Sequence, residues 1–95
     1  MIETKDARLR KLQFRAWRRG FREADLILGP FADFHVQTMT PSELDAFETL
    51  LDQPDPDLYG WILGQTETPA EYDTEVMSAI KMFREQAHEN ITHGG

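Results

Sequence analysis

The chain has 95 residues, none of them cysteine, with 40% apolar, 28% charged and 11% aromatic residues and a formal net charge of −7. This length fills one modest hydrophobic core, and the composition is that of a folded domain rather than a disordered segment. Disulfides, thiol chemistry, iron–sulfur clusters and cysteine-ligated zinc are excluded, and no apolar run approaches the roughly 20 residues that cross a bilayer. We therefore expect a single domain over residues 1–95 that is cytoplasmic, monomeric and not inserted in a membrane.

Charge is distributed unevenly along the chain. Residues 1–23 hold eight basic and three acidic residues, a net +5, whereas residues 24–80 hold twelve acidic and no basic residues and residues 81–95 are neutral. Such a division makes a dipolar molecule that can orient against a partner of mixed charge. It is equally compatible with a basic helix that packs beside acidic helices of the same fold.

The first two predicted helices meet at a glycine. Apolar residues at helical spacing, uninterrupted by proline or glycine, predict a first helix over residues 6–18, with Leu9, Leu12, Ala16 and the adjacent Trp17. After Gly20 a second buried stripe predicts a helix over about residues 21–36, with Ala24, Ile27, Leu28, Phe31 and Phe34. Pro30 lies inside this pattern, and because it lacks an N–H and crowds the preceding turn, we expect a kink or a local break there.

Cap-then-proline signals predict a third and a fourth helix. In Thr40-Pro41-Ser42-Glu43 a hydroxyl caps free amides, proline stands where no N–H is needed, and a glutamate reaches back to the cap. The helix that follows should bury Leu44, Phe47 and Leu51. Asp55-Pro56 repeats the device, and a short fourth helix should end at a left-handed Gly64 and bury Leu58, Tyr59, Trp61, Ile62 and Leu63.

A second capping box, Thr68-Pro69-Ala70-Glu71, predicts the start of a fifth and longest helix that ends near Glu89. Its buried positions should be Tyr72, Val76, Ala79, Ile80, Phe83 and Ala87. No segment shows the sustained alternation of apolar and polar residues that marks a strand. We therefore predict an all-α protein, a small compact five-helix bundle with an ordered core over about residues 6–88 and a flexible C-terminal tail over residues 90–95.

Catalytic and metal-binding patterns are weak in this sequence. The three histidines, His35, His88 and His93, are scattered, and the last two are spaced five apart, which does not place them on one helical face. Carboxylate pairs such as Asp55 and Asp57 are explained by capping and solvation. No phosphate loop, catalytic triad or calcium loop is present. We predict no catalytic residue, no metal ion and no cofactor of the protein's own.

The basic N-terminal region also raises the question of nucleic-acid binding. Its cations could neutralise phosphates: Arg8, Arg10, Lys11, Arg15, Arg18, Arg19 and Arg22. The acidic remainder of the chain would repel the same phosphate backbone. We therefore expect no nucleic-acid partner.

The junction of the first two helices, residues 18–23, is the remaining candidate for a functional surface. Arg19 offers a planar fork suited to a carboxylate or a pair of carbonyls on a partner, and Gly20 has no side chain to hold that partner's backbone away. Glu23, near the start of a helix, is favoured by the helix dipole and could brace Arg19 or Arg22. The same residues also fit a purely structural role, with Gly20 as a helix stop and Glu23 as a cap.

Two sequence blocks resemble a known family. Arg-Arg-Gly-Phe-Arg-Glu-Ala-Asp over residues 18–25, followed by Leu28, Pro30 and Phe31, resembles the signature of the SdhE family of FAD assembly factors for succinate dehydrogenase, whose hallmark is Arg-Gly-x-x-Glu. Asp-Pro-Asp-Leu-Tyr-Gly-Trp over residues 55–61 is similar to that family's other recurrent segment, at the expected distance. The resemblance covers roughly residues 5–88. Phe21 and Gly29 are small departures outside the motif positions.

The resemblance implies a function for the junction. It implies an assembly factor or chaperone, not an enzyme, that binds the flavoprotein subunit of succinate dehydrogenase, or in some bacteria of fumarate reductase, and promotes covalent attachment of FAD to a histidine of that subunit. It further implies a flavoprotein-facing surface made of Arg19, Gly20 and Glu23, flanked by Arg18, Arg22 and Asp25. An alternative within the same family is an antitoxin-like interaction module that restrains an inner-membrane partner.

Overall fold

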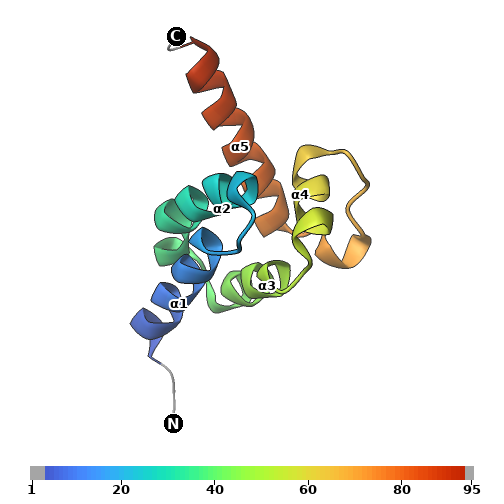
Figure 1. The fold of residues 1–95 in the computed structure, drawn as a ribbon. Coiled ribbons are helices and arrows are strands. Elements are labelled where there is room, and N and C mark those ends of the chain that lie inside the picture. Colours follow the sequence, from blue (N-terminus) through green and yellow to red (C-terminus); the bar gives the residue numbers. More distant parts are fainter. Residues whose placement is uncertain (1–3, 94–95) are drawn as a thin grey trace.

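The computed structural model describes the backbone of residues 4–93 and the side chains of residues 4–87. Its helices are α1 (Lys5–Trp17), α2 (Arg22–His35), α3 (Pro41–Leu51), α4 (Asp55–Leu63) and α5 (Glu75–His93), with short 3₁₀ turns at Val36–Thr38 and Ala70–Tyr72. No strand occurs in this part of the chain, so the predicted all-α, five-helix fold is confirmed. Figure 1 shows α5 as the longest helix, with its C-terminal half extending beyond the other four.

Three of the helix ends follow directly from local chemistry. Thr4 caps α1 by accepting a hydrogen bond from the amide of Ala7, at 3.1 Å. The predicted capping box of α3 is confirmed, because Thr40 accepts from the Glu43 amide at 3.2 Å while the Glu43 carboxylate accepts from the Thr40 amide at 2.8 Å. Gly64 ends α4 with φ +75°, as predicted.

Two predicted helix caps do not form, because their polar residues bind elsewhere. Asp55 does not cap α4: Pro54 occupies the cap position, and the Asp55 carboxylate binds Arg19 instead. The second capping box does not form, since the Thr68 hydroxyl accepts from Lys81 at 3.0 Å and a 3₁₀ turn follows. α5 begins later, after Thr74, whose hydroxyl accepts from the Met77 amide at 3.3 Å.

Two helices are more continuous than expected. Of the kink or break expected at Pro30, the break does not occur, since α2 runs through it; Leu26, whose carbonyl Pro30 cannot bond, is 58% exposed and open to water. α5 continues to His93, because no proline or glycine interrupts residues 75–93. Residues 90–93 are therefore helical rather than a loose tail, and residues 94–95 lie outside the described part of the chain.

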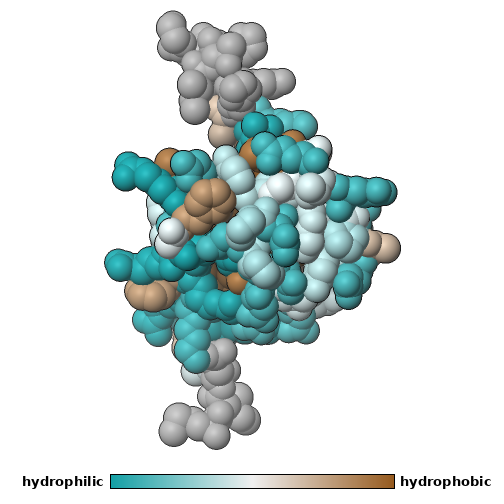
Figure 2. Space-filling model, turned by 45° about the vertical axis from the view of Figure 1, so that its right-hand side comes forward, coloured by the Kyte–Doolittle hydropathy of each residue, from teal (hydrophilic) through white to brown (hydrophobic). Residues whose placement is uncertain are grey.

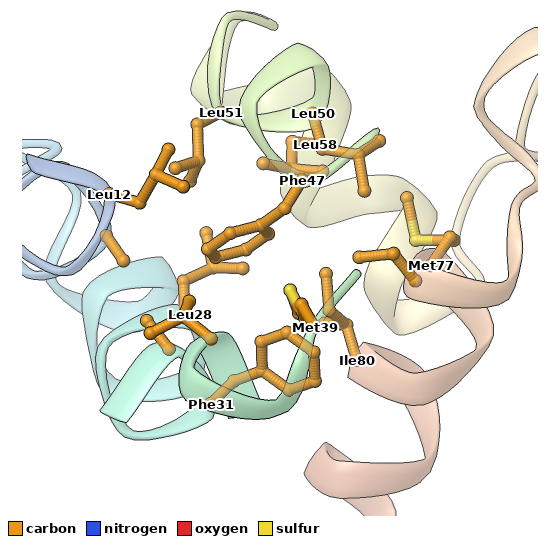
Figure 3. Packing of buried hydrophobic residues seen from close by; sticks show 14 of the residues in the cluster. Leu12, Leu28, Phe31, Met39, Phe47, Leu50, Leu51, Leu58, Met77 and Ile80 are labelled. Carbon is orange, nitrogen blue, oxygen red and sulfur yellow. The ribbon is translucent and has the colours of Figure 1, made fainter. Parts of the chain in front are cut away.

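One apolar cluster holds the five helices together. Phe47 projects into its middle, with Leu12 and Leu28 to one side and Met77 and Ile80 to the other (Figure 3). Every helix contributes residues to this cluster. These side chains are fully or almost fully buried, which is the main source of stability for a domain of this size.

Two of the predicted core residues lie at the surface instead. Phe34 is 73% exposed, and Ala87 is also exposed. Phe34 stands at the edge of the bundle, where its ring still approaches that of Phe83, with 6.0 Å between the centroids. Helical periodicity identifies the face of a helix but not how far along the helix its neighbours cover it.

The basic and acidic segments of the chain pair with each other within the fold. Arg8 on α1 binds Asp45 on α3 at 2.6 Å, and Arg15 binds Asp52, just after α3, at 2.5 Å. For these pairs, the structure confirms the second interpretation of the charge pattern, in which the basic helix packs beside acidic helices of the same fold. Figure 2 shows a largely hydrophilic face with apolar residues in separate spots. Among the described residues, no helix is both long and apolar enough to cross a membrane.

Trp17 fixes the end of α1 against α2 through a close contact with Gly29. A Cβ built on Gly29 would lie 2.3 Å from the Trp17 ring, so a glycine is needed at this position. One turn along α2, Asp33 accepts a hydrogen bond from the Trp17 indole N–H at 3.1 Å. These two contacts set the distance between the helices on either side of the junction.

We expect Gly29→Ala to lower the free energy of unfolding by about 1–3 kcal/mol, because the added methyl group must displace the indole ring. Alanine favours a helix over glycine by about 1 kcal/mol, so helix propensity alone predicts the opposite sign. Urea denaturation of the wild type and the variant measures the difference. In a Trp17→Leu background, the same substitution should lower the free energy of unfolding far less. If Gly29→Ala instead raises the free energy of unfolding in the wild-type background, the close contact with Trp17 is contradicted.

Candidate partner-binding site

The side chain of Arg19 is held inside the protein by three acceptors. Its Nε donates to Asp55 Oδ1 at 2.5 Å, its Nη1 to the carbonyl oxygen of Leu51 at 2.6 Å, and its Nη2 to the carbonyl oxygen of Gln53 at 2.6 Å. Only 7% of the Arg19 side chain is exposed, against 28% of the Asp55 side chain. We refer to Arg19, Asp55 and the two carbonyl groups as the Arg19 clamp.

The clamp joins two helix ends whose dipoles favour it. Leu51 is the last residue of α3, so its carbonyl lacks an intrahelical partner and a cation is favoured there. Asp55 is the first residue of α4, where an anion is favoured. An arginine fork can address the carboxylate and both carbonyls at once, whereas the single ammonium group of a lysine cannot match that geometry.

Gly20 lies between two residues that both contact α4. Arg19 binds Asp55, and the Phe21 ring packs edge-on against Tyr59, one turn further along α4, with 4.9 Å between the centroids. Gly20 has φ +88°, a left-handed conformation that other residues rarely adopt. A Cβ built there would meet no atom within 4 Å, so the glycine is open on its outer side while both neighbours are anchored.

The six predicted site residues divide into an exposed and an inward-facing group. The residues of the exposed group are Arg18, Gly20, Arg22 and Glu23. The inward-facing group is Arg19, held in its clamp, and Asp25, whose carboxylate accepts a hydrogen bond from the Arg19 amide at 3.0 Å. The structure therefore brings all six to one junction but presents only four of them to solvent.

Glu23 stands in the first turn of α2, where the helix dipole favours its charge. Among the described side chains it forms no ion pair with Arg19 or Arg22, so the bracing role considered from the sequence is not observed. It is not a side-chain cap either, because Phe21 occupies the cap position of α2 without a side-chain hydrogen bond. Beyond this favourable position at the helix start, its exposed carboxylate makes no ion pair or cap within the described chain.

A shallow hollow of about 310 Å³ adjoins the clamp. It is lined by apolar, polar and charged side chains: Phe14, Arg15, Arg18, Arg19, Leu51, Gln53, Pro54 and Asp55. Phe14 is 61% exposed, and the Arg18 guanidinium lies over its ring, 4.7 Å from the centroid. Reasoning from the sequence did not single out Phe14, although an aromatic residue outside the buried stripe, one helical turn before an arginine, is a usable signal.

No group of three or more metal-ligating side chains occurs within the described residues. His35 packs among aromatic rings instead, stacked on Phe31 at 4.6 Å and edge-on to Phe83 at 5.8 Å. The side chains of His88 and His93 lie outside those that the structure describes. What the junction offers a partner is an exposed glycine between two anchored residues, with the exposed charges of Arg18, Arg22 and Glu23 around it.

Comparisons with known proteins agree on one family. The profile of the Sdh5 family, described as a flavinator of succinate dehydrogenase, matches residues 10–84. The chain is 42% identical over 72 residues, 76% of its length, to a succinate dehydrogenase assembly factor 2, mitochondrial, from Dictyostelium discoideum. It is 41% identical over 71 residues, 75% of its length, to an FAD assembly factor SdhE from Acetobacter pasteurianus. The chain spans 51% and 65% of the lengths of these two relatives.

We expect Arg19→Ala to lower the free energy of unfolding by about 2–4 kcal/mol, because it leaves a largely buried carboxylate and two carbonyls without their donor. Arg19→Lys should recover only part of this loss. The matched control is Arg15→Ala, which removes a single ion pair whose side chains are 39% and 59% exposed and should cost less than about 1 kcal/mol. Equal costs for the two alanine variants, measured by urea denaturation, would contradict the clamp.

Proposed function

The chain belongs to the Sdh5/SdhE family of succinate dehydrogenase assembly factors, and on that premise we propose that it binds the flavoprotein subunit of succinate dehydrogenase and promotes covalent attachment of FAD to a histidine of that subunit. The flavoprotein of fumarate reductase is a second client under this proposal. The observation that carries it is the family match over residues 10–84, which contains both the junction and the whole Arg19 clamp.

Under this proposal the exposed residues of the junction contact the flavoprotein, and the inward-facing ones hold them in place. Gly20 lets the partner's backbone approach, while exposed Arg18, Arg22 and Glu23 supply charges of both signs around it. Arg19 and Asp25 are positioning residues, because their side-chain hydrogen bonds are made within the chain. The proposal thus keeps all six predicted residues and gives them two different tasks.

The proposed action is orientation rather than catalysis. The flavoprotein supplies both the histidine and the FAD that react. The assembly factor binds an immature flavoprotein, favours the arrangement in which the two groups are aligned, and then leaves. The sequence contains no Gly-x-Gly-x-x-Gly fingerprint, so the proposal includes no FAD site on this chain. The proposal also places the protein in the cytoplasm as a monomer. A chain without cysteine is compatible with this reducing compartment.

We expect Gly20→Arg to abolish co-purification with the flavoprotein while the chain stays folded. Gly64→Arg is a matched control, because both glycines have positive φ and both would place a Cβ in open space. Each substitution should cost about 1–2 kcal/mol of backbone strain, measured as a similar fall in thermal stability by circular dichroism. Only Gly20→Arg should lose binding. Retained binding by Gly20→Arg, or equal loss in both variants, would refute the proposed surface.

We also expect deletion of the gene to remove covalent flavin from the client. The measurement is flavin fluorescence of the flavoprotein band on a denaturing gel, in which only covalently bound FAD remains with the protein. Return of the signal with the wild-type gene, but not with a Gly20→Arg gene, would link the effect to the junction. Unchanged flavinylation in the deletion strain would contradict the assembly role and favour an interaction module of a different kind, such as an antitoxin-like partner.

A further inference from the structure

Arg18 is the one guanidinium in the hollow beside the clamp that is not committed within the described chain. Arg15 is paired with Asp52 and Arg19 with Asp55, both at 2.5 Å. Arg18 is exposed, and its described contact is with the ring of Phe14, over which it lies. This contact holds the guanidinium beside the ring while its N–H groups remain available to an acceptor.

The charge of the hollow matches a single negative group. Three guanidinium groups line it, and the two carboxylates that pair with Arg15 and Arg19 stand beside them, which leaves one positive charge. The two carboxylates would repel a phosphate or pyrophosphate, which carries a higher negative charge. A carboxylate has the charge and the planar pair of oxygens that a guanidinium binds best.

The hollow also has an apolar side. Phe14, Pro54 and Leu51 line it together with the arginines, and Phe14 is 61% exposed. A large exposed aromatic ring beside a charged group is typical of the anchor points of protein interfaces. If an acidic side chain of a partner binds Arg18, the partner residues next to it are therefore brought onto this apolar surface.

We propose that this hollow is a docking subsite for an Asp or Glu side chain of the partner, which binds the Arg18 guanidinium while an adjacent apolar residue of the partner covers Phe14. This inference rests on the proposed function, since the partner is taken to be the flavoprotein. It transfers to Arg18 the carboxylate-binding role that the sequence suggested for Arg19, whose fork is occupied by its own chain. Arg18 is thereby a specificity-determining contact rather than a flank of the motif.

The test is the affinity of the purified flavoprotein subunit for the full chain and its variants at low salt. Arg18→Glu should weaken binding by about tenfold or more and Phe14→Ala by about threefold or more. Lys5→Glu makes the same change of charge about 20 Å away, at the opposite end of α1, and Phe34→Ala removes an exposed aromatic residue that does not line the hollow. Both controls should bind within about twofold of the wild type.

Zero-length carbodiimide coupling identifies the partner group. In the complex of the Arg18→Lys variant, the introduced amine should form an amide with an Asp or Glu of the flavoprotein, located by mass spectrometry of the linked peptides. The native amine of Lys5 serves as the internal control and should not link to the same acidic residue. If the introduced lysine at position 18 forms no amide with any carboxylate of the flavoprotein, the proposal is overturned.

The outcomes separate this inference from the function on which it rests. If the wild type binds the flavoprotein and Arg18→Glu binds equally well, the subsite is wrong and the proposed function stands. If the wild type does not bind, both fail. If free FAD, added as a probe, binds the wild type but not Arg18→Glu, the hollow recognises a phosphate-bearing cofactor, and the assignment to a carboxylate is overturned.

Discussion

The hydrogen bonds of one largely buried guanidinium determine the geometry of the whole junction. Arg19 follows α1 in the chain, yet its side chain binds the end of α3 and the start of α4, which lie more than thirty residues further on. The partners suit the charge, since a carbonyl-rich helix end and an aspartate at a helix start both favour a cation between them. Because the turn between α3 and α4 is attached in this way, α4 becomes the support for the loop that connects α1 and α2.

The two blocks of sequence that carry the family resemblance are two halves of one structural unit. Residues 18–25 supply Arg19 and Phe21, and residues 55–61 supply their partners Asp55 and Tyr59. These contacts on both sides hold the exposed Gly20 at φ +88°, although a Cβ built on it would meet no atom within 4 Å outside the adjacent residues. Arg19 and Phe21 are held by contacts within the chain, while Arg18, Gly20, Arg22 and Glu23 are exposed. Under the proposed function, this arrangement presents the exposed residues to the partner in a fixed conformation.

The fold was largely predictable from the sequence because periodicity and caps act locally. The burial of Leu12, Phe47 and Ile80 followed from helical spacing alone. The sites where prediction failed depend on contacts distant in sequence: Asp55 has the chemistry of a cap but is bound by Arg19, and Thr68 is bound by Lys81. The junction could be located from the sequence because its signals are local. The inward direction of the Arg19 side chain could not, because it depends on residues distant in sequence. Only the tertiary structure shows that its acceptors lie on the same chain.

We propose that the surface around Gly20, supported by the Arg19 clamp, is the face that meets the flavoprotein. Hydrogen–deuterium exchange of the chain, alone and in complex with the flavoprotein subunit, tests this most directly because it reports every backbone segment at once. We expect slower exchange over residues 14–25 and 51–55 on binding, with little change over residues 78–87 of α5. Slower exchange confined to α5, with residues 14–25 unchanged, would contradict it.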